Sequence, residues 1–163
     1  MGFETAAVRG VEVHYGVRDT ENSLGGELST KGANKELVLT FDFDDLPSGS
    51  NAGLAAQLPA NCSILSARLE VLTGFTSTST TTDLLIGVTD ADGGSNITDA
   101  DGLIAAAEAT QTAIATAGNI VTGAGAMVGT TIGAEAGVVT VAPSVDDLTA
   151  GKGRVVVEYV LKG

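Results

Sequence analysis

Short segments of alternating apolar and polar residues are the feature that most constrains this fold. Leu37, Leu39, Phe41 and Phe43 alternate with polar residues, and the turn sequence at 45–49 follows them. A period of two is that of a strand with one buried face. The pattern recurs at the ranges 11–17, 64–75, 84–90, 138–145 and 152–161. The chain is therefore predicted to be mainly β.

Seven or eight such strands with short turns predict an all-β chain, an antiparallel β-sandwich that is jelly-roll-like. Residues 120–122 and 127–128 are expected to add two short strands among glycines. In the strand from about 64 to 75, Leu65 is expected to point inward with Leu69. Pro143 predicts a sheet edge or a strand end, because proline cannot donate to a ladder of hydrogen bonds.

One short helix is predicted after the fourth of these strands. Thr98-Asp99-Ala100-Asp101 fits the pattern of a capping box, with acids at the positive end of the helix dipole. Leu103, Ile104, Ala107 and Ile114 share one face at helical spacing. Gly118-Asn119 supplies the expected C-terminal stop.

Two regions are predicted along the chain. Residues 1–35 contain one strand, at 11–17, and a polar, glycine-bearing stretch that predicts an extended N-terminal arm. Residues 36–163 form the sandwich domain. The sequence shows neither a secretory signal nor an apolar run long enough for a spanning helix, so we expect no membrane partner.

The distribution of charge separates the chain into a mixed part and an acidic part. The net charge is −12, and no Lys or Arg occurs between Arg68 and Lys152. Binding to nucleic acid or to anionic membranes is disfavoured, because both need clustered cations. The fold is expected to present one strongly acidic side and one mixed side. The acidic side can simply keep the protein soluble, and the mixed side can dock on a partner.

Few residues of this chain could form a catalytic or metal-binding site. His14 and Cys62 are the only histidine and cysteine, so an internal disulfide is excluded and a zinc site nearly so. His14 lies on the polar face of its expected strand, and Cys62 precedes another strand. We expect a small, buried or half-buried thiol rather than a Cys-His nucleophile pair.

An acidic loop resembles part of a calcium site. Asp90 and Asp92 precede a glycine turn, and Asp99 and Asp101 follow closely. Clustered carboxylates with a tight turn suit a hard cation, but the spacing is not that of an EF-hand. The alternative is a solvated acidic loop followed by a helix cap. Calcium at this loop is the one cofactor considered, and no other is expected.

The pattern as a whole resembles the decoration, or cement, proteins of tailed-bacteriophage capsids. The resemblance covers roughly residues 36–161, and none of the segments that carry it is catalytic. These segments are Leu58-Pro59-Ala60-Asn61-Cys62-Ser63-Ile64, Leu69-Glu70-Val71-Leu72-Thr73, Leu85-Ile86-Gly87-Val88-Thr89-Asp90-Ala91-Asp92-Gly93, Thr98-Asp99-Ala100-Asp101-Gly102-Leu103, Gly129-Thr130-Thr131-Ile132-Gly133 and Thr149-Ala150-Gly151-Lys152-Gly153-Arg154-Val155-Val156-Val157-Glu158-Tyr159.

The resemblance implies a non-enzymatic virion protein on the outer surface of the capsid. Such proteins bridge neighbouring subunits of the major capsid protein, usually as homotrimers and sometimes as dimers. Their N-terminal arms often reach over adjacent subunits, so Arg9, Arg18, Lys31 and Lys35 are the cations expected to meet acidic capsid surface. The alternatives are a head-fibre or tail structural protein, a carbohydrate- or calcium-binding surface module, and an enzyme of unassigned mechanism.

Overall fold

The structure is a computed structural model that describes residues 5–7, 10–12, 34–46, 52–92 and 98–161. The chain divides into two compact units, Met1–Ala33 and Asn34–Gly163. In the first unit, β1 (Thr5–Ala7) pairs antiparallel with β2 (Gly10–Glu12). The rest of the strand expected at 11–17 lies outside the described residues. No helix in the described part of the chain has the length and hydropathy needed to span a membrane.

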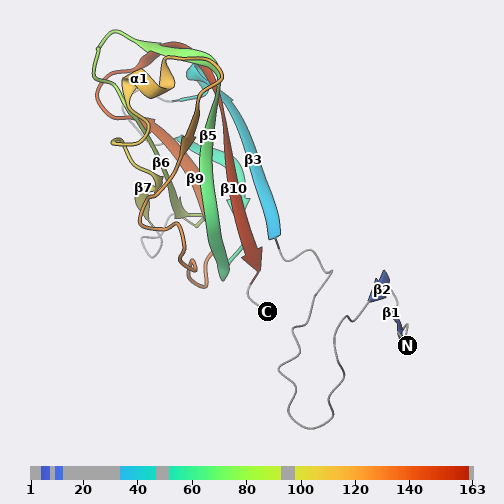
Figure 1. The fold of residues 1–163 in the computed structure, drawn as a ribbon. Coiled ribbons are helices and arrows are strands. Elements are labelled where there is room, and N and C mark those ends of the chain that lie inside the picture. Colours follow the sequence, from blue (N-terminus) through green and yellow to red (C-terminus); the bar gives the residue numbers. More distant parts are fainter. Residues whose placement is uncertain (1–4, 8–9, 13–33, 47–51, 93–97, 162–163) are drawn as a thin grey trace. The chain divides into compact units, whose positions relative to one another are not determined.

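The second unit contains two antiparallel sheets of four strands each (Figure 1). The first sheet has the order β3-β10-β5-β8, and the second has the order β4-β9-β6-β7. The first sheet is made of β3 (Asn34–Asp42), β10 (Leu148–Leu161), β5 (Cys62–Ser77) and β8 (Ile120–Thr122). The second is made of β4 (Ala52–Leu58), β9 (Gly137–Pro143), β6 (Leu84–Asp90) and β7 (Asp99–Ile104).

The strands are nested along the chain. β3 pairs with β10, β4 with β9, β5 with β8 and β6 with β7, so the first strand of the unit lies beside the last. This nesting places neighbours along the chain in opposite sheets at the start of the unit and forms two antiparallel sheets of four strands. The predicted antiparallel β-sandwich is confirmed.

A single core lies between the two sheets. In β5, β6 and β10, alternate residues that face the other sheet are apolar and almost fully excluded from solvent, as the period of two requires. The largest of the fully buried side chains are Phe41, Phe75, Leu58, Ile64, Leu69, Leu84, Ile86, Leu103, Ile104 and Ile114.

Two phenylalanines and a glycine close one part of this core. The rings of Phe41 and Phe75 stack with centroids 5.7 Å apart. Gly151 in β10 has φ +130°, and a Cβ there would lie 2.1 Å from Cδ1 of Phe75. Only glycine combines this backbone conformation with so close an approach.

The predicted register of β5 is wrong at its beginning. Ile64 is fully buried, whereas Leu65, which was expected to point inward, is 42% exposed. The cause is a β-bulge: Tyr159 pairs with Ile64 and Glu158 with Ser66, so Leu65 has no opposite residue. One extra residue reverses the alternation, and strict counting from Leu69 back to Leu65 misses it.

One short helix is confirmed, but its predicted beginning at Thr98 is wrong. Asp99–Ile104 is strand β7, and the only described α-helix is α1 (Gln111–Ile114), a single turn capped by Thr110. β7 pairs with β6, and the backbone of β7 approaches Gly87 so closely that a Cβ there would lie 1.9 Å from the Asp99 carbonyl oxygen. Strand pairing along β6 therefore outweighs the local capping pattern.

The predictions for the short segments between residues 120 and 145 are partly confirmed and partly wrong. β8 at Ile120–Thr122 is confirmed, and β9 ends at Pro143 as expected. Val145, expected in that strand, lies beyond it and is 63% exposed. Met127–Val128 is a turn and not a strand, because Val128 N–H donates to the Gly125 carbonyl at 3.0 Å.

Candidate partner-binding face

The outer face of the β3-β10-β5-β8 sheet carries an organised set of charges. In β10, Val155, Val157 and Tyr159 point into the core, so Arg154, Val156 and Glu158 point outward. The register places charged residues of β3 and β5 beside them. We name this surface the mixed-charge face; its charged residues are Glu36, Asp42, Arg68, Glu70, Lys152, Arg154 and Glu158.

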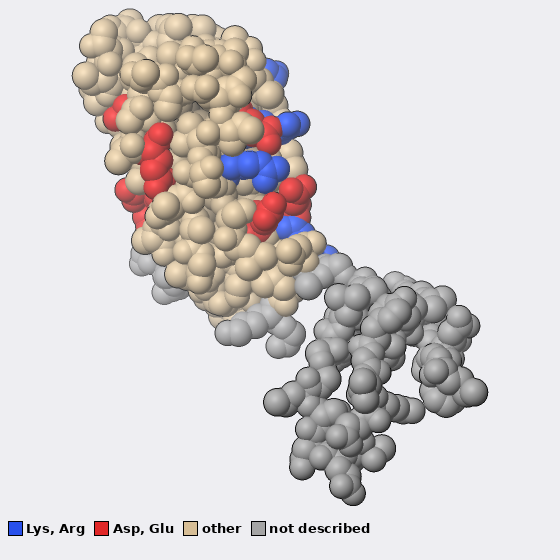
Figure 2. Space-filling view, in the orientation of Figure 1, with Lys and Arg blue, Asp and Glu red and all other residues tan. Residues whose placement is uncertain are grey.

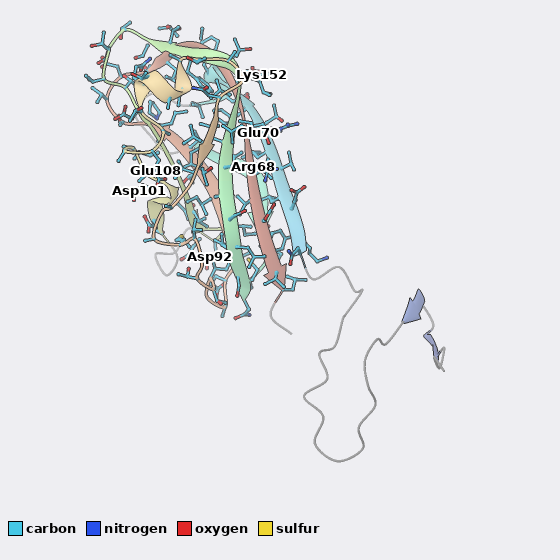
Figure 3. All side chains as sticks on the ribbon, viewed as in Figure 1. Arg68, Glu70, Asp92, Asp101, Glu108 and Lys152 are labelled. Atoms are coloured by element: carbon cyan, nitrogen blue, oxygen red, sulfur yellow. The ribbon has the colours of Figure 1, made fainter. Side chains whose placement is uncertain are left out.

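Arg68 lies near Glu70 on this face (Figure 3), and it contacts three carboxylates in all. Its Nη2 is 3.5 Å from Glu36 Oε1, its Nε is 3.1 Å from Glu70 Oε1, and its Nη1 is 3.5 Å from Glu158 Oε1. Glu36 and Glu158 are directly opposite each other in the β3–β10 register. Like charges in that position repel, so Arg68 compensates a pairing that would otherwise be unfavourable.

Glu70 is shared between two arginines. Arg154 and Arg68 both donate hydrogen bonds to its carboxylate, and the Arg154 Nε bond is 2.8 Å long. The hydrogen bond from Arg154, and then that from Arg68, holds the pKa of Glu70 below its ordinary value. The hydrogen bond to Glu70 likewise raises the pKa of Arg68. Both groups therefore stay charged over a wide pH range.

Apolar side chains complete the same face. Val156 lies between Val38 and Arg68 in the register and is buried although it points outward. The neighbouring side chains therefore cover it, as the aliphatic stem of an arginine does. Val38 is 52% exposed and Ile120 is 64% exposed. The face thus offers paired charges with exposed apolar residues at β3 and β8, which is a composition suited to a protein partner.

The charges of the sandwich are distributed asymmetrically, as the sequence predicted. Among the described residues, Lys and Arg occur only on β3, β5 and β10. In Figure 2 the blue side chains lie over these strands, and the side that carries β7 shows acids alone. The described acids away from the mixed-charge face include Asp83, Asp92, Asp99, Asp101, Glu108, Glu135, Asp146 and Asp147.

The cations predicted to contact a partner are only partly described. Lys35 is in β3, exposed at the beginning of the strand. Arg9, Arg18 and Lys31 lie outside the described residues, so their role stays a prediction. The cations at the centre of the mixed-charge face are others, namely Arg68, Lys152 and Arg154.

The acids predicted to bind calcium occupy different settings. Asp90 ends β6 and is 4% exposed, Asp92 is exposed, and Asp99 and Asp101 are in β7. The Asp101 N–H donates to Asp99 Oδ1 at 3.4 Å. Burial raises the pKa of Asp99, and a side-chain hydrogen bond with Asp101 adds to this effect, whereas the hydrogen bond from the Asp101 N–H opposes it. Among the described residues, no three such side chains are placed to hold an ion, and the calcium site stays a prediction.

Several other acids have structural partners. Glu108 accepts hydrogen bonds from the Ala105 N–H at 3.1 Å and from the Ala124 N–H at 3.0 Å. Asp83 accepts from the Gln111 N–H at 2.8 Å at the beginning of α1. These acids therefore fix loops between the strands as well as charging the surface.

Cys62 is fully buried at the beginning of β5, and burial raises the pKa of its thiol. A raised pKa disfavours the thiolate, which is the reactive form. The sequence prediction of a buried thiol is confirmed. His14 lies outside the described residues.

Three solved structures contain chains that are similar to this one. A chain of the cyanophage Pam1 capsid is 19% identical with a TM-score of 0.56, over 90% of this chain and 98% of that chain. This fold is shared with phage capsid proteins. A chain of the Ralstonia phage GP4 capsid is 21% identical with a TM-score of 0.54, over 83% and 90% of the two chains.

The third similar chain comes from the acid-stable capsid of Helicobacter pylori bacteriophage KHP30. It is 20% identical with a TM-score of 0.53, over 80% of this chain and 90% of that chain. No protein-family model and no curated protein sequence matches this chain. At such identities the similarity concerns the fold.

The sequence predicted the cation-poor stretch and a side of mixed charge, but not the strands and ion pairs that form the mixed-charge face. Arg68 meets Glu36 and Glu158, which are far away in the sequence, only because β3 and β5 flank β10. The available signal was the set of charges at alternate positions of these strands. Charges at Glu36, Arg68, Glu70, Arg154 and Glu158 all fall on the polar side of an alternating strand.

Proposed function

We propose that this protein is a structural virion protein that binds the outer surface of a phage capsid and bridges neighbouring subunits of the major capsid protein. The observation that carries the proposal is the fold similarity to chains of three phage capsids, over 80 to 90% of this chain. The role is that of a decoration, or cement, protein, as the sequence resemblance implies. It requires no catalytic step.

The mixed-charge face is the surface that we assign to the capsid contact. A partner surface with charges of both signs can exchange ion pairs with Arg68, Lys152 and Arg154 and with their carboxylate partners. Val38 and Ile120 add exposed apolar area on the same face. The acidic side, which lacks described cations, then faces solvent and keeps decorated particles apart.

Attachment in several copies strengthens such a contact. We propose a homo-oligomer, with the trimer as the form that the resemblance favours. When one subunit of an oligomer is bound, the others bind at a high effective concentration, so weak single contacts give firm attachment. The cations of residues 1–35 extend the contact in this proposal. Light scattering of the purified protein is then expected to give close to three times 16.2 kDa, or twice that mass where two trimers associate.

Co-sedimentation with empty capsids of the same phage tests the proposal. Two matched variants distinguish the binding face from the rest of the surface. Ile120→Glu adds a carboxylate at a 64% exposed residue of the mixed-charge face, and Val145→Glu adds one at a 63% exposed residue in the loop between β9 and β10. We expect the first to weaken binding and the second to leave it unchanged.

Two results would contradict the proposal in different ways. If the protein does not sediment with capsids at any salt concentration, the capsid role is wrong. Sedimentation with isolated tails would then favour the tail-component alternative. If capsids bind and Val145→Glu weakens binding as much as Ile120→Glu, the assignment of the mixed-charge face is wrong.

A further inference from the structure

The described sandwich has four sheet edges, and they are protected to different degrees. The β7 edge is covered by a loop, because Gly125 N–H and Met127 N–H donate to the Leu103 and Gly102 carbonyls at 3.2 and 2.8 Å. β8 has three residues, and beside it Gly129 N–H donates to Ile64 of β5 at 2.9 Å. The pairing of β4 with β9 is interrupted by a register shift.

β3 differs from the other three edges. It pairs with β10 over nine consecutive residues, from Asn34 to Asp42, without a register shift. It contains neither proline nor a bulge, which are common means of blocking an edge. On its other side, no described residue forms a backbone hydrogen bond to it. A strand of this length has a row of backbone groups available to another strand.

We propose that β3 pairs antiparallel with β3 of a second copy of this chain, with Val38 on the two-fold axis. This proposal concerns contact between copies and does not depend on capsid binding. The contact is isologous, so each copy supplies the same surface. It joins two four-stranded sheets into one continuous sheet of eight strands.

The side chains of β3 fit this register. Val38 is the midpoint of the strand, so all nine residues pair. On the outer side Val38 faces Val38, Glu36 faces Thr40, and Asn34 faces Asp42. The exposed apolar surface of Val38, which is 52% accessible, is then covered by its own copy. Neither acid lies opposite another acid.

The inner side fits as well. In the same register Leu37 of each copy faces Leu39 of the other. Both leucines are partly buried and pack against the core of their own sandwich. Pairing would cover more of their surface and make the two cores nearly continuous, which is favourable because apolar area leaves water.

Other registers are less favourable. A pairing centred on Leu39 would place Glu36 opposite Asp42 twice, and like charges in direct opposition repel. A pairing centred on Leu37 leaves Phe41 and Asp42 unpaired and places Glu36 opposite Val38. A shift by one residue would bring the apolar inner face of one copy to the outer side of the other.

The pairing has a consequence for the mixed-charge face. The two-fold axis runs perpendicular to the sheet, so the outer faces of both copies point in the same direction. Two mixed-charge faces then form one surface, with Arg68 of each copy on either side of the axis. A dimer has this contact alone, and trimers can have it where two of them meet.

A disulfide between introduced cysteines tests the register. The axis brings Val38→Cys opposite its own copy, at a Cα separation of about 4.5–5.5 Å, which is suitable for a disulfide. Thr40→Cys is the matched control on the same side of the same strand. Its two copies would be four residues apart along the strand, or about 14 Å, which is too far. Cys62 is fully buried and does not interfere.

Mild oxidation of the full chain is followed by non-reducing gel electrophoresis. We expect Val38→Cys to shift from 16.2 kDa to twice that mass, and Thr40→Cys to remain at 16.2 kDa. A mixture of Glu36→Cys and Thr40→Cys is expected to form heterodimers, although neither variant cross-links alone. This second pair covers the case in which Val38→Cys fails to fold.

Three cross-linking results would contradict the proposed β3–β3 contact or its register. Equal cross-linking of Val38→Cys and Thr40→Cys would indicate random collision and overturn the proposal. Absence of a cross-link from the folded Val38→Cys variant, together with absence from the mixture, would overturn it as well. Cross-linking of Thr40→Cys alone would refute the register.

Discussion

Replacing Ile64 or Leu65 of β5, one at a time, tests the sandwich where the orientation predicted from the sequence differs from that in the structure. Ile64 is fully buried, and its neighbour Leu65 is 42% exposed, because a bulge leaves Leu65 without an opposite residue. Changing either residue to alanine removes the same number of carbon atoms. The two variants therefore differ only in where those atoms lie, inside the core or at the surface.

The expected magnitudes are well separated. Truncating a fully buried isoleucine to alanine lowers the free energy of unfolding by about 3.5 kcal/mol, the middle of the usual range for such substitutions. An unfolding entropy of about 2.1 cal/mol/K per residue over about 130 residues gives about 0.27 kcal/mol/K. Ile64→Ala should then lower the Tm by about 13 °C. Leu65→Ala should lower the free energy of unfolding by about 0.5 kcal/mol and the Tm by about 2 °C.

Thermal and urea unfolding followed by circular dichroism measure both variants under the same conditions. Equal urea m-values are expected, because the surface exposed on unfolding hardly changes. If Leu65→Ala is the more damaging variant, Leu65 faces the core and the bulge is absent, so the alternation of β5 continues unbroken to its beginning.

Three other properties follow from the structure. Gly151→Ala should lower the Tm measurably, because the new Cβ would meet Phe75 and the backbone has φ +130°; an unchanged Tm would refute the close approach. Cys62 should react with a thiol reagent only as fast as the protein unfolds, because its side chain is fully buried and out of reach of the reagent; a fast reaction in the native state would show access to solvent. The hydrogen bonds from Arg154 and Arg68 lower the pKa of Glu70, so they stabilise the fold at pH values above the unfolded-state pKa of this carboxyl group. This stabilisation is lost as the pH falls through the folded-state pKa. Urea midpoints of Glu70→Gln should therefore differ from those of the unchanged protein at neutral pH and converge in acid, whereas a constant difference would exclude the ion pairs as its cause.

Alternation was sufficient to predict the strands that face the core on one side only. β3, β6, β9 and β10 all appear where the period of two indicates. The prediction was wrong where a neighbouring strand decides the conformation. Residues 99–104 have a good capping pattern for a helix, but β6 offers them a partner and Gly87 lets that partner approach. Such pairing is non-local, so no local pattern indicates it.

The ion pairs of the mixed-charge face could not be predicted from the sequence, for a similar reason. Charge counting predicted a side without cations, and the four described cations do lie on one sheet. It could not identify which carboxylates compensate Arg68, because Glu36 and Glu158 meet only through the order of the strands. Of the four cations predicted to contact a partner, only Lys35 therefore lies among the described residues of this sheet, at the beginning of β3.

The arrangement of charges also explains how one sandwich can present two different surfaces. Every cation described in the sandwich comes from β3, β5 or β10, whereas acids occur on both sheets and in the loops between them. On the mixed-charge face the ion pairs reduce the net charge, so approach of a partner that is itself acidic meets little long-range repulsion. The acidic side retains its repulsion. A protein of high net negative charge can therefore bind through one sheet and still repel other particles through the opposite one.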